Sequence, residues 1–239
     1  LAARRLADAE RRDLCRVAFG TRCRLPGKRL AVSDIFDLFR KISAPAASAA
    51  PLGYVIAGLG NPGAEYENTR HNVGFAALDF VAAQMGARID RARFDALCGE
   101  GTLGGQRVLL LKPQTYMNLS GRAVGAALSF YKLPPERLIV LCDDVSFDVG
   151  RLRIRLHGSH GGHNGLRNIT EQIGSENFPR LKIGVGKKPR PDYDLADWVL
   201  GRFPADAAAP LAAAFADVAA ALPLLLSGKS EEALCRYSH

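Results

Sequence analysis

Short apolar runs bounded by Gly, Pro or Asp recur along the chain from residue 54 onward. Three of them are Tyr54 to Ala57, Val108 to Leu111 and Leu138 to Cys142. Uninterrupted apolar runs of this length are typical of strands that are buried on both faces. We therefore expect these segments to form the inner strands of a sheet.

Stretches with helical periodicity lie between and after these strands, at residues 74–85, 120–131 and 165–173. Because strands alternate with helices, the pattern predicts an α/β fold in a single domain, with a mixed, mostly parallel central sheet flanked by helices on both faces. The alanine-rich residues 205–226 predict a helix or a helix pair that packs on this sheet.

Two further strands differ from the others because polar and apolar residues alternate along them. They are residues 151–156 and 180–185, where basic side chains fall on one face and aliphatic side chains on the other. Such a face is either simply solvated or a ledge for phosphate groups, since guanidinium groups bind phosphate oxygens in a bidentate fork. The basic positions are Arg151, Arg153, Arg155, Arg180 and Lys182.

The net charge is concentrated at one end of the chain. The 239 residues include 32 basic and 24 acidic side chains, for a formal charge of +8. Residues 1–31 contain nine of the basic and three of the acidic side chains, so they carry +6 and residues 32–239 carry +2. A uniformly basic protein would be expected to bind nucleic acid or an anionic membrane. Here the body is nearly neutral, so any anion site in it has to be built locally.

Composition divides the chain into three parts. Residues 1–31 are a basic extension, which we expect not to belong to the mature protein; a transit peptide is the alternative, but the segment lacks Ser and contains acids. Residues 32–51 combine a short helix, capped by Ser33 or Asp34, with a linker of Ala, Pro and Ser. Residues 52–239 are the α/β domain.

The cysteines and the apolar content argue against several classes of protein. The five cysteines are scattered and form no C-x-x-C pair, which argues against a disulfide framework or a zinc site and for free thiols in a reducing compartment. No uncharged apolar run approaches 18 residues, so we expect no membrane span. An apolar content of 48% excludes a wholly disordered chain.

The loop Gly58 to Gly63 satisfies the pattern G-x-G-x-x-G directly after a predicted strand. A dinucleotide site would need a helix at the third Gly and an acid at the end of the next strand. Here Pro62 stiffens the turn, the residues that follow are polar, and Asp79 falls within a helical pattern. We therefore favour a sharp turn that places Asn61 at the carboxyl end of the strand.

Polar residues at the ends of other predicted strands complete a candidate site. Because the carboxyl ends of parallel strands meet at one edge of a sheet, we expect these residues to converge there. The set offers one base, His71, one acid to orient it, Asp143, and amides that can bind an ester or amide substrate while His71 acts on water. Its members are Asn61, His71, Asn118, Asp143 and Asn164.

Each of these residues also has a simpler interpretation. A lone His such as His71 is often structural, and Asn118 or Ser120 could serve only as the N-cap of a helix. Metal binding by three His is conceivable, but their spacing matches no common zinc site. The chain has no G-x-S-x-G motif for a nucleophilic Ser. The three His are His157, His160 and His163.

Three motifs together resemble the bacterial-type peptidyl-tRNA hydrolase family over residues 52–235. They are GLGNPG with the following Tyr66-x-x-Thr-Arg-His-Asn-x-Gly, then KPQTYMNLSG, then GSHGGHNGLRNI. The resemblance implies a monomeric enzyme of the bacterial cytoplasm that cleaves the ester joining a peptide to the 3′ ribose of tRNA. It also implies no cofactor or metal, no obligate protein partner, and a role in recycling tRNA from aborted translation. Import into an organelle is less expected.

The resemblance also implies roles for individual residues. His71 would be the general base, Asp143 would orient it, and Asn61 would help to distinguish N-blocked from free aminoacyl-tRNA. One departure is Val145-Ser-Phe-Asp148, where the family usually has Leu-Asp-Leu-Pro. The residues implied to line the path of the tRNA 3′ end and the peptide are Tyr66, Tyr116, Met117, Asn118 and Asn164, and those implied to hold tRNA phosphate are Arg153, Arg155 and Lys182.

A catalytically idle relative that binds structured RNA is the alternative function. The basic residues 1–31 would support RNA binding. Against this alternative, every candidate catalytic position is intact, whereas an idle protein would be free to lose His71 or Asp143.

Overall fold

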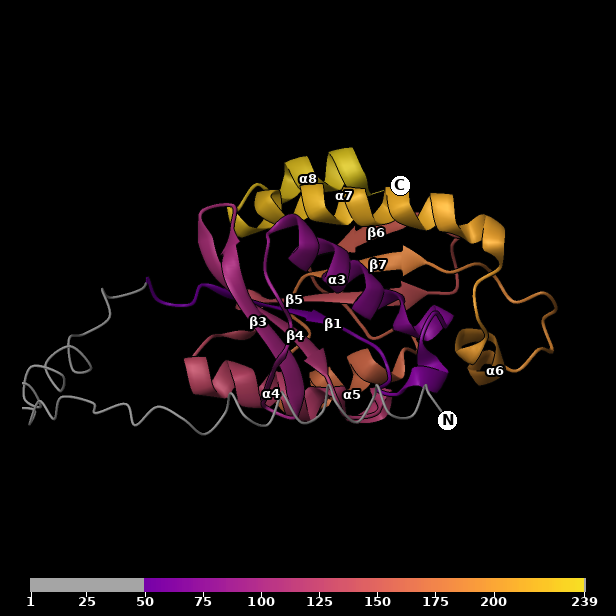
Figure 1. Ribbon diagram of the computed structural model, residues 1–239, viewed down its shortest axis with the longest axis horizontal. Helices are drawn as coiled ribbons and strands as arrows, with labels where there is room; N and C mark the ends of the chain where they lie inside the picture. The colour runs from indigo at the N-terminus through magenta and orange to yellow at the C-terminus, as the bar shows by residue number, and fades with distance from the viewer. Residues whose placement is uncertain (1–49, 239) are drawn as a thin grey trace, which may run out of the picture. The chain divides into compact units, whose positions relative to one another are not determined.

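A seven-stranded sheet organises residues 50–238, the part of the chain that this computed structural model describes (Figure 1). The strand order is β2-β3-β4-β1-β5-β7-β6. The inner strands β4, β1, β5 and β7 run parallel, and β2, β3 and β6 are antiparallel to their neighbours. The bounds are β1 Tyr54–Gly58, β2 Arg91–Arg93, β3 Ala96–Leu103, β4 Gln106–Pro113, β5 Leu138–Asp144, β6 Leu152–Arg155 and β7 Arg180–Gly184.

Helices cover both faces of the sheet, as the alternating pattern predicts. Figure 1 shows α7 and α8 above the sheet and α4 and α5 below it, with α6 set apart near one end. The α/β class and the mostly parallel sheet are confirmed. The bounds are α3 Val73–Gln84, α4 Ser120–Tyr131, α5 Asn164–Ile173, α6 Leu195–Leu200, α7 Ala208–Leu226 and α8 Ser230–Tyr237.

The inner strands are buried on both faces, which explains why their sequences are continuously apolar. Ile56 of β1 packs in a core with α3 and α7, whereas its neighbours Val55 and Ala57 pack in a second core with α4 and α5. All three side chains have no exposed surface.

Two strands, β3, which forms a hairpin with the predicted strand β4, and the short β2 beside it, are absent from the elements expected from sequence. Gly99 and Gly101 interrupt the apolar pattern of β3, so its sequence lacks the signature of a strand. The turn between the strands is Gly104-Gly105, and both residues have positive φ, as two-residue hairpin turns require.

The prediction about the two basic strands is wrong in one respect. Arg180 of β7 is only 1% exposed, and its guanidinium donates hydrogen bonds to the carbonyls of Gly158, Ser159 and Glu176. It holds the loop before α5 in place and cannot contribute to a solvent-facing ledge. Arg153 and Lys182 are directly opposite each other across β6 and β7 and remain partly accessible.

Residues 50–238 contain one helix that is long and apolar enough to cross a membrane, although two acidic residues interrupt its apolar sequence. Ala205–Leu226 qualifies by length and by its mean hydropathy of 1.9. Only the inner face of this helix packs in the core, through residues such as Ala214, Val218 and Leu222. A core helix of this composition passes the same test, so the observation is weak evidence for a membrane. The expected helix near Ser33 and the basic extension lie outside the described residues.

Close packing of α3 on β1 brings two loops of the candidate site together. A Cβ atom at Gly58 would collide with the carbonyl oxygen of Gly74, and one at Gly74 would lie 2.5 Å from the carbonyl oxygen of Leu141. Only glycine allows this approach. It places the turn after β1 beside the residues that lead into α3.

Candidate active site

A cleft of about 940 Å³ opens at the carboxyl ends of the parallel strands. Its volume suits a substrate larger than a single amino acid. The predicted convergence is confirmed, because one cleft is lined by the whole set of polar residues from the strand ends: Asn61, His71, Asn118, Asp143 and Asn164.

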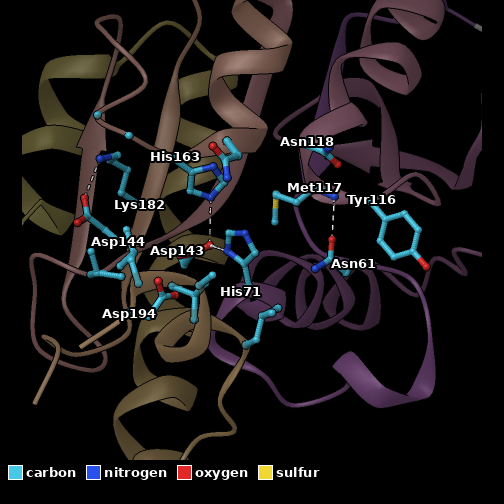
Figure 2. A pocket seen from close by; sticks show the side chains of 18 of the residues that line it. Asn61, His71, Tyr116, Met117, Asn118, Asp143, Asp144, His163, Lys182 and Asp194 are labelled. Atoms are coloured by element: carbon cyan, nitrogen blue, oxygen red, sulfur yellow. Dashed lines mark hydrogen bonds and ion pairs between the residues drawn. The ribbon is translucent and has the colours of Figure 1, made fainter. Parts of the chain in front are cut away.

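Asn61 is fixed by three hydrogen bonds. Its backbone N–H donates to Asn72 Oδ1 (2.8 Å), and Asn72 Nδ2 donates back to the Asn61 carbonyl (2.9 Å). Its side-chain Oδ1 accepts from the backbone N–H of Met117 (2.7 Å). The acceptor end of the Asn61 amide is therefore used by the protein, and its donor end, Nδ2, remains for a ligand. Figure 2 shows this side chain across the cleft from His163, with His71 between them.

One carboxylate oxygen joins two histidines at the centre of the cleft. Asp143 Oδ1 lies 2.7 Å from His71 Nδ1 and 3.0 Å from His163 Nε2 (Figure 2). All three side chains are largely buried, with 12%, 4% and 7% exposure for His71, Asp143 and His163. Burial raises the pKa of Asp143, but the charges and hydrogen bonds of the two histidines outweigh it and hold that pKa below its usual range. Asp143 is therefore ionised.

The surrounding hydrogen bonds give the two histidines different roles. His163 is the N-cap of α5, and its Nδ1 accepts from the backbone N–H groups of Gly165 (3.1 Å) and Leu166 (3.3 Å). Because Nδ1 is an acceptor, Nε2 must carry the proton that His163 donates to Asp143. His71 donates to Asp143 through Nδ1, so in the neutral ring Nε2 holds a lone pair. No residue in 50–238 forms a hydrogen bond with His71 Nε2, which makes it the available base.

A second carboxylate pairs with a cation beside this centre. Lys182 Nζ lies 2.7 Å from Asp144 Oδ2, and both residues line the cleft. Burial raises the pKa of Asp144, but the hydrogen bond and charge of Lys182 and the N–H of Ser146 lower it overall. Ser146 belongs to the segment that departs from the family pattern, and its N–H donates to Asp144 Oδ1 (2.9 Å).

The other residues singled out by sequence fall into two groups. Tyr116 and Met117 line the cleft, and Tyr116 is 55% exposed. Tyr66 does not line it; its ring packs edge-on against Tyr116, with centroids 6.3 Å apart. Arg153 and Arg155 also lie outside the lining, Arg153 over the ring of Phe147 and Arg155 exposed.

Sequence reasoning missed two parts of the site. The sequence suggests only a metal-ligand role for His163, because His is not among the residues that usually cap a helix N-terminus. The helix α6 gave no signal at all, because it is only six residues long. The residues of this segment that line the cleft are Asp194, Leu195, Ala196, Val199 and Leu200.

The three-histidine metal site is not what the structure shows in residues 50–238. The group with suitable geometry is instead His71, Asp143 and His163, whose ligand atoms all lie within 4.8 Å of one another. The nitrogen atoms in question already donate hydrogen bonds to Asp143, and a metal would have to replace both protons. The hydrogen bonds account for the arrangement without an ion.

Known proteins resemble this chain in sequence and in fold. A family model described as Peptidyl-tRNA hydrolase matches residues 55–239. A peptidyl-tRNA hydrolase from Agathobacter rectalis is 47% identical over 186 residues, which are 77% of this chain and all of that protein. One from Lachnospira eligens is 45% identical over 185 residues, 77% of this chain and 99% of that protein.

A solved structure agrees with the sequence relatives. The crystal structure of peptidyl-tRNA hydrolase from Acinetobacter baumannii superimposes with a TM-score of 0.73 at 34% identity, covering 80% of this chain and 99% of that chain. The sequence comparisons and the fold comparison therefore agree, and the chain belongs to the peptidyl-tRNA hydrolase family.

Proposed function

We propose that His71 is the general base in the hydrolysis of the ester bond of peptidyl-tRNA, the reaction that this family carries out. The observation that carries the proposal is the shared oxygen of Asp143. It fixes His71 with Nδ1 protonated and Nε2 facing the cleft, while the second histidine is held as a helix cap. General-base catalysis needs such a nitrogen within reach of water.

The reaction proceeds in two steps. His71 Nε2 takes a proton from a water molecule as the water oxygen attacks the ester carbonyl carbon. Asp143 stabilises the imidazolium that forms, since the carboxylate is ionised and only 2.7 Å from Nδ1. The tetrahedral intermediate then collapses, the bond to the ribose 3′ oxygen breaks, and His71 returns the proton to that oxygen. The products are a free peptide and free tRNA.

Amide groups around the cleft supply hydrogen bonds to the substrate. Asn118 and Asn164 both line the cleft, and both are exposed. Amide donors aimed at the carbonyl oxygen would stabilise its negative charge in the tetrahedral intermediate. Tyr116, which is exposed at the rim, would offer a ring face to the terminal base of the tRNA.

Asn61 explains selection for a blocked amino group. Its Oδ1 is committed to Met117 N–H, so only the donor Nδ2 is left for the substrate. A donor binds the acyl oxygen of a peptide or N-acetyl group, but it has nothing to offer a free ammonium, which is itself only a donor. Free aminoacyl-tRNA therefore forfeits this hydrogen bond and gains an unfavourable contact.

Cations next to the cleft are proposed to hold tRNA phosphate. Lys182 lines the cleft, and Arg153 lies directly across the β6–β7 pair from it. Arg155 is exposed on the same strand. A few such contacts are enough to position the tRNA while the domain remains nearly neutral.

We infer that residues 52–239 act as a monomer in the bacterial cytoplasm, on peptidyl-tRNA from aborted translation. The proposal that residues 1–31 are not part of the mature protein is tested by mass spectrometry of the native chain. A native protein that begins with the intact basic segment would contradict it.

The experiment compares two substrates. The protein is incubated with N-acetyl-aminoacyl-tRNA and with unblocked aminoacyl-tRNA, and released amino acid is measured. We expect turnover of the blocked substrate alone. Tight tRNA binding without turnover would instead support the idle RNA-binding relative, and hydrolysis of both substrates would contradict the assigned role of Asn61.

A further inference from the structure

Arg70, the residue before His71, is a buried cation without an acidic partner. It is only 8% exposed, and no carboxylate of residues 50–238 lies within ion-pair distance of it. Its Nε has no hydrogen-bond partner in the described structure. Burial lowers the pKa of this guanidinium, with the nearby Tyr193 opposing that effect. Burying an unpaired charge is unfavourable, so other contacts have to stabilise this guanidinium.

All of the described contacts of the guanidinium are with one neighbouring segment. Its Cζ lies 3.7 Å from the centre of the Trp198 ring in α6, a close cation–π contact. Its Nη1 donates to the carbonyl oxygen of Arg202 at 2.9 Å. The backbone contacts the same segment. Arg70 N–H donates to Gly201 O (3.1 Å), and Thr69 forms an antiparallel β-bridge with Arg202.

Trp198 is held on its other sides as well. Its Nε1 donates to the carbonyl oxygen of Gly186 (2.9 Å), and Tyr193 packs edge-on against its ring with centroids 6.1 Å apart. A helix of six residues is too short to be stable alone, so α6 depends on these contacts for its position. Arg70 is thus the link between α6 and the segment that carries His71.

This link matters because α6 forms a wall of the cleft. Leu195, Val199 and Leu200 of the helix line the same cavity as His71. Leu195 and Leu200 are 44% and 40% exposed, so they present apolar surface to whatever occupies the cleft. Moving α6 would change the distance between this apolar surface and the base without touching either Asp143 or His163.

We infer that Arg70 is a positioning residue, which holds α6 through Trp198 and so sets how tightly the cleft binds the peptidyl end of the substrate. The expected effect on kinetics rests on the proposed function, the hydrolysis of peptidyl-tRNA in this cleft. Because α6 contacts bound substrate and not the reacting atoms, loosening it removes binding that is equal in the ground and transition states. Such a loss raises KM and leaves kcat unchanged.

The kinetic test compares two substitutions that remove the same charge. Arg70→Met removes the contact with Trp198, whereas Arg202→Met removes an exposed side chain close by and leaves the contact intact. For N-acetyl-aminoacyl-tRNA, we expect Arg70→Met to raise KM about 10-fold, with kcat within about threefold of the parent and an unchanged pH profile. Arg202→Met should leave KM near that of the parent. Equal KM values for the two variants, or a fall in kcat with a shifted pH profile, would overturn the inference.

Substitutions of Trp198 provide a second kinetic test. Trp198→Leu should raise KM as much as Arg70→Met does. Trp198→Phe should keep KM near that of the parent, because it retains an aromatic face. The double variant Arg70→Met/Trp198→Leu should have a KM no higher than that of either single variant. Effects that multiply in the double variant would contradict coupling. If Arg70→Met does not fold, the difference between Trp198→Leu and Trp198→Phe decides the question.

A measurement without substrate separates this inference from the proposed function. The chain contains a single tryptophan, so its fluorescence reports on Trp198 alone. We expect acrylamide to quench Arg70→Met far more strongly than the parent or Arg202→Met, because the guanidinium covers one ring face. Equal quenching of Arg70→Met and the parent would overturn the inference about Arg70 even if the parent hydrolyses the substrate. If Arg70→Met is quenched more strongly but the parent does not hydrolyse the substrate, the proposed function is refuted and the contact between Arg70 and Trp198 is not.

Discussion

Asp143 Oδ1 lies 2.7 Å from His71 Nδ1, and this contact leaves the other ring nitrogen, Nε2, without a partner among residues 50–238. The same oxygen accepts from His163 at 3.0 Å, so the carboxylate is held from two sides and cannot turn away from His71. The proposed role of His71 as the base therefore requires that Asp143 stays ionised and that the His71 tautomer stays fixed.

Asp143→Asn should abolish most activity while the fold is retained. The Asn side chain can donate its Nδ2 hydrogen to His71 Nδ1, which would move the ring proton to Nε2 and remove the lone pair from the cleft. We expect the single-turnover rate of deacylation to fall by on the order of 10²–10⁴-fold. The secondary structure should be unchanged by circular dichroism, and near-normal deacylation by the variant would show that the tautomer is not fixed by Asp143.

The ionised state of Asp143 predicts a specific pH dependence of stability. The pKa of this carboxyl is lower in the folded protein than the value of about 3.9 expected in an unfolded chain. Its interactions therefore stabilise the fold fully above that unfolded value, and the contribution is lost as pH falls through the folded pKa. We expect the difference in free energy of unfolding between the parent and Asp143→Asn to shrink as the pH falls below about pH 4.

Urea unfolding at a series of pH values measures this difference directly. A difference that grows on acidification would mean that the folded protein raises the pKa of Asp143. In that case burial would outweigh the two histidines.

Asn61→Asp should weaken discrimination between blocked and free substrates. A carboxylate at this position can still accept from Met117 N–H, and its second oxygen would face the cleft where Nδ2 now lies. That oxygen attracts the free ammonium of aminoacyl-tRNA and cannot donate to an acyl oxygen. We expect the ratio of kcat/KM for N-acetylated over free substrate to fall by about 10-fold or more.

Asn118→Asp provides the matched control for Asn61→Asp. It adds the same charge to the same cleft without altering the contact with Met117. If both variants lower the ratio equally, the selectivity comes from charge in the cleft as a whole and not from Asn61.

Several features of this molecule were predictable because each depends on local sequence. The inner strands follow from uninterrupted apolar runs, and the approach of Asn61, His71 and Asp143 follows from their places at the carboxyl ends of parallel strands. Ser120 begins α4, as the periodicity predicts. The parallel order of the strands then brings together residues that are far apart in the chain.

Other features depend on tertiary contacts that no local pattern contains. The alternation along β7 places Arg180 on the polar face, yet loop carbonyls enclose it and leave it 1% exposed. His163 meets Asp143 only because α5 starts beside the end of β5. Tyr66 carries part of the family motif but supports Tyr116 from outside the cleft lining.

Arg155→Ala should weaken tRNA binding through loss of a phosphate contact. Arg155 is exposed, so its removal leaves no buried group unpaired. We expect the slope of log affinity against log salt concentration to become shallower by about 0.7–0.9, the value for one phosphate contact. Arg91→Ala, which removes an exposed Arg of β2 at the other edge of the sheet from β6, should leave the slope unchanged. An unchanged slope for Arg155→Ala would exclude the proposed contact.

The assignment of the base is tested most directly by comparing the two histidines in single-turnover deacylation of N-acetyl-aminoacyl-tRNA. His71→Ala should lower the rate by about 10²-fold or more. His163→Asn keeps a side chain that can cap α5 and removes only the hydrogen bond to Asp143, so its rate should fall by about 10-fold or less. A rate for His71→Ala within a few-fold of the parent, or a larger loss in His163→Asn than in His71→Ala, would contradict the account.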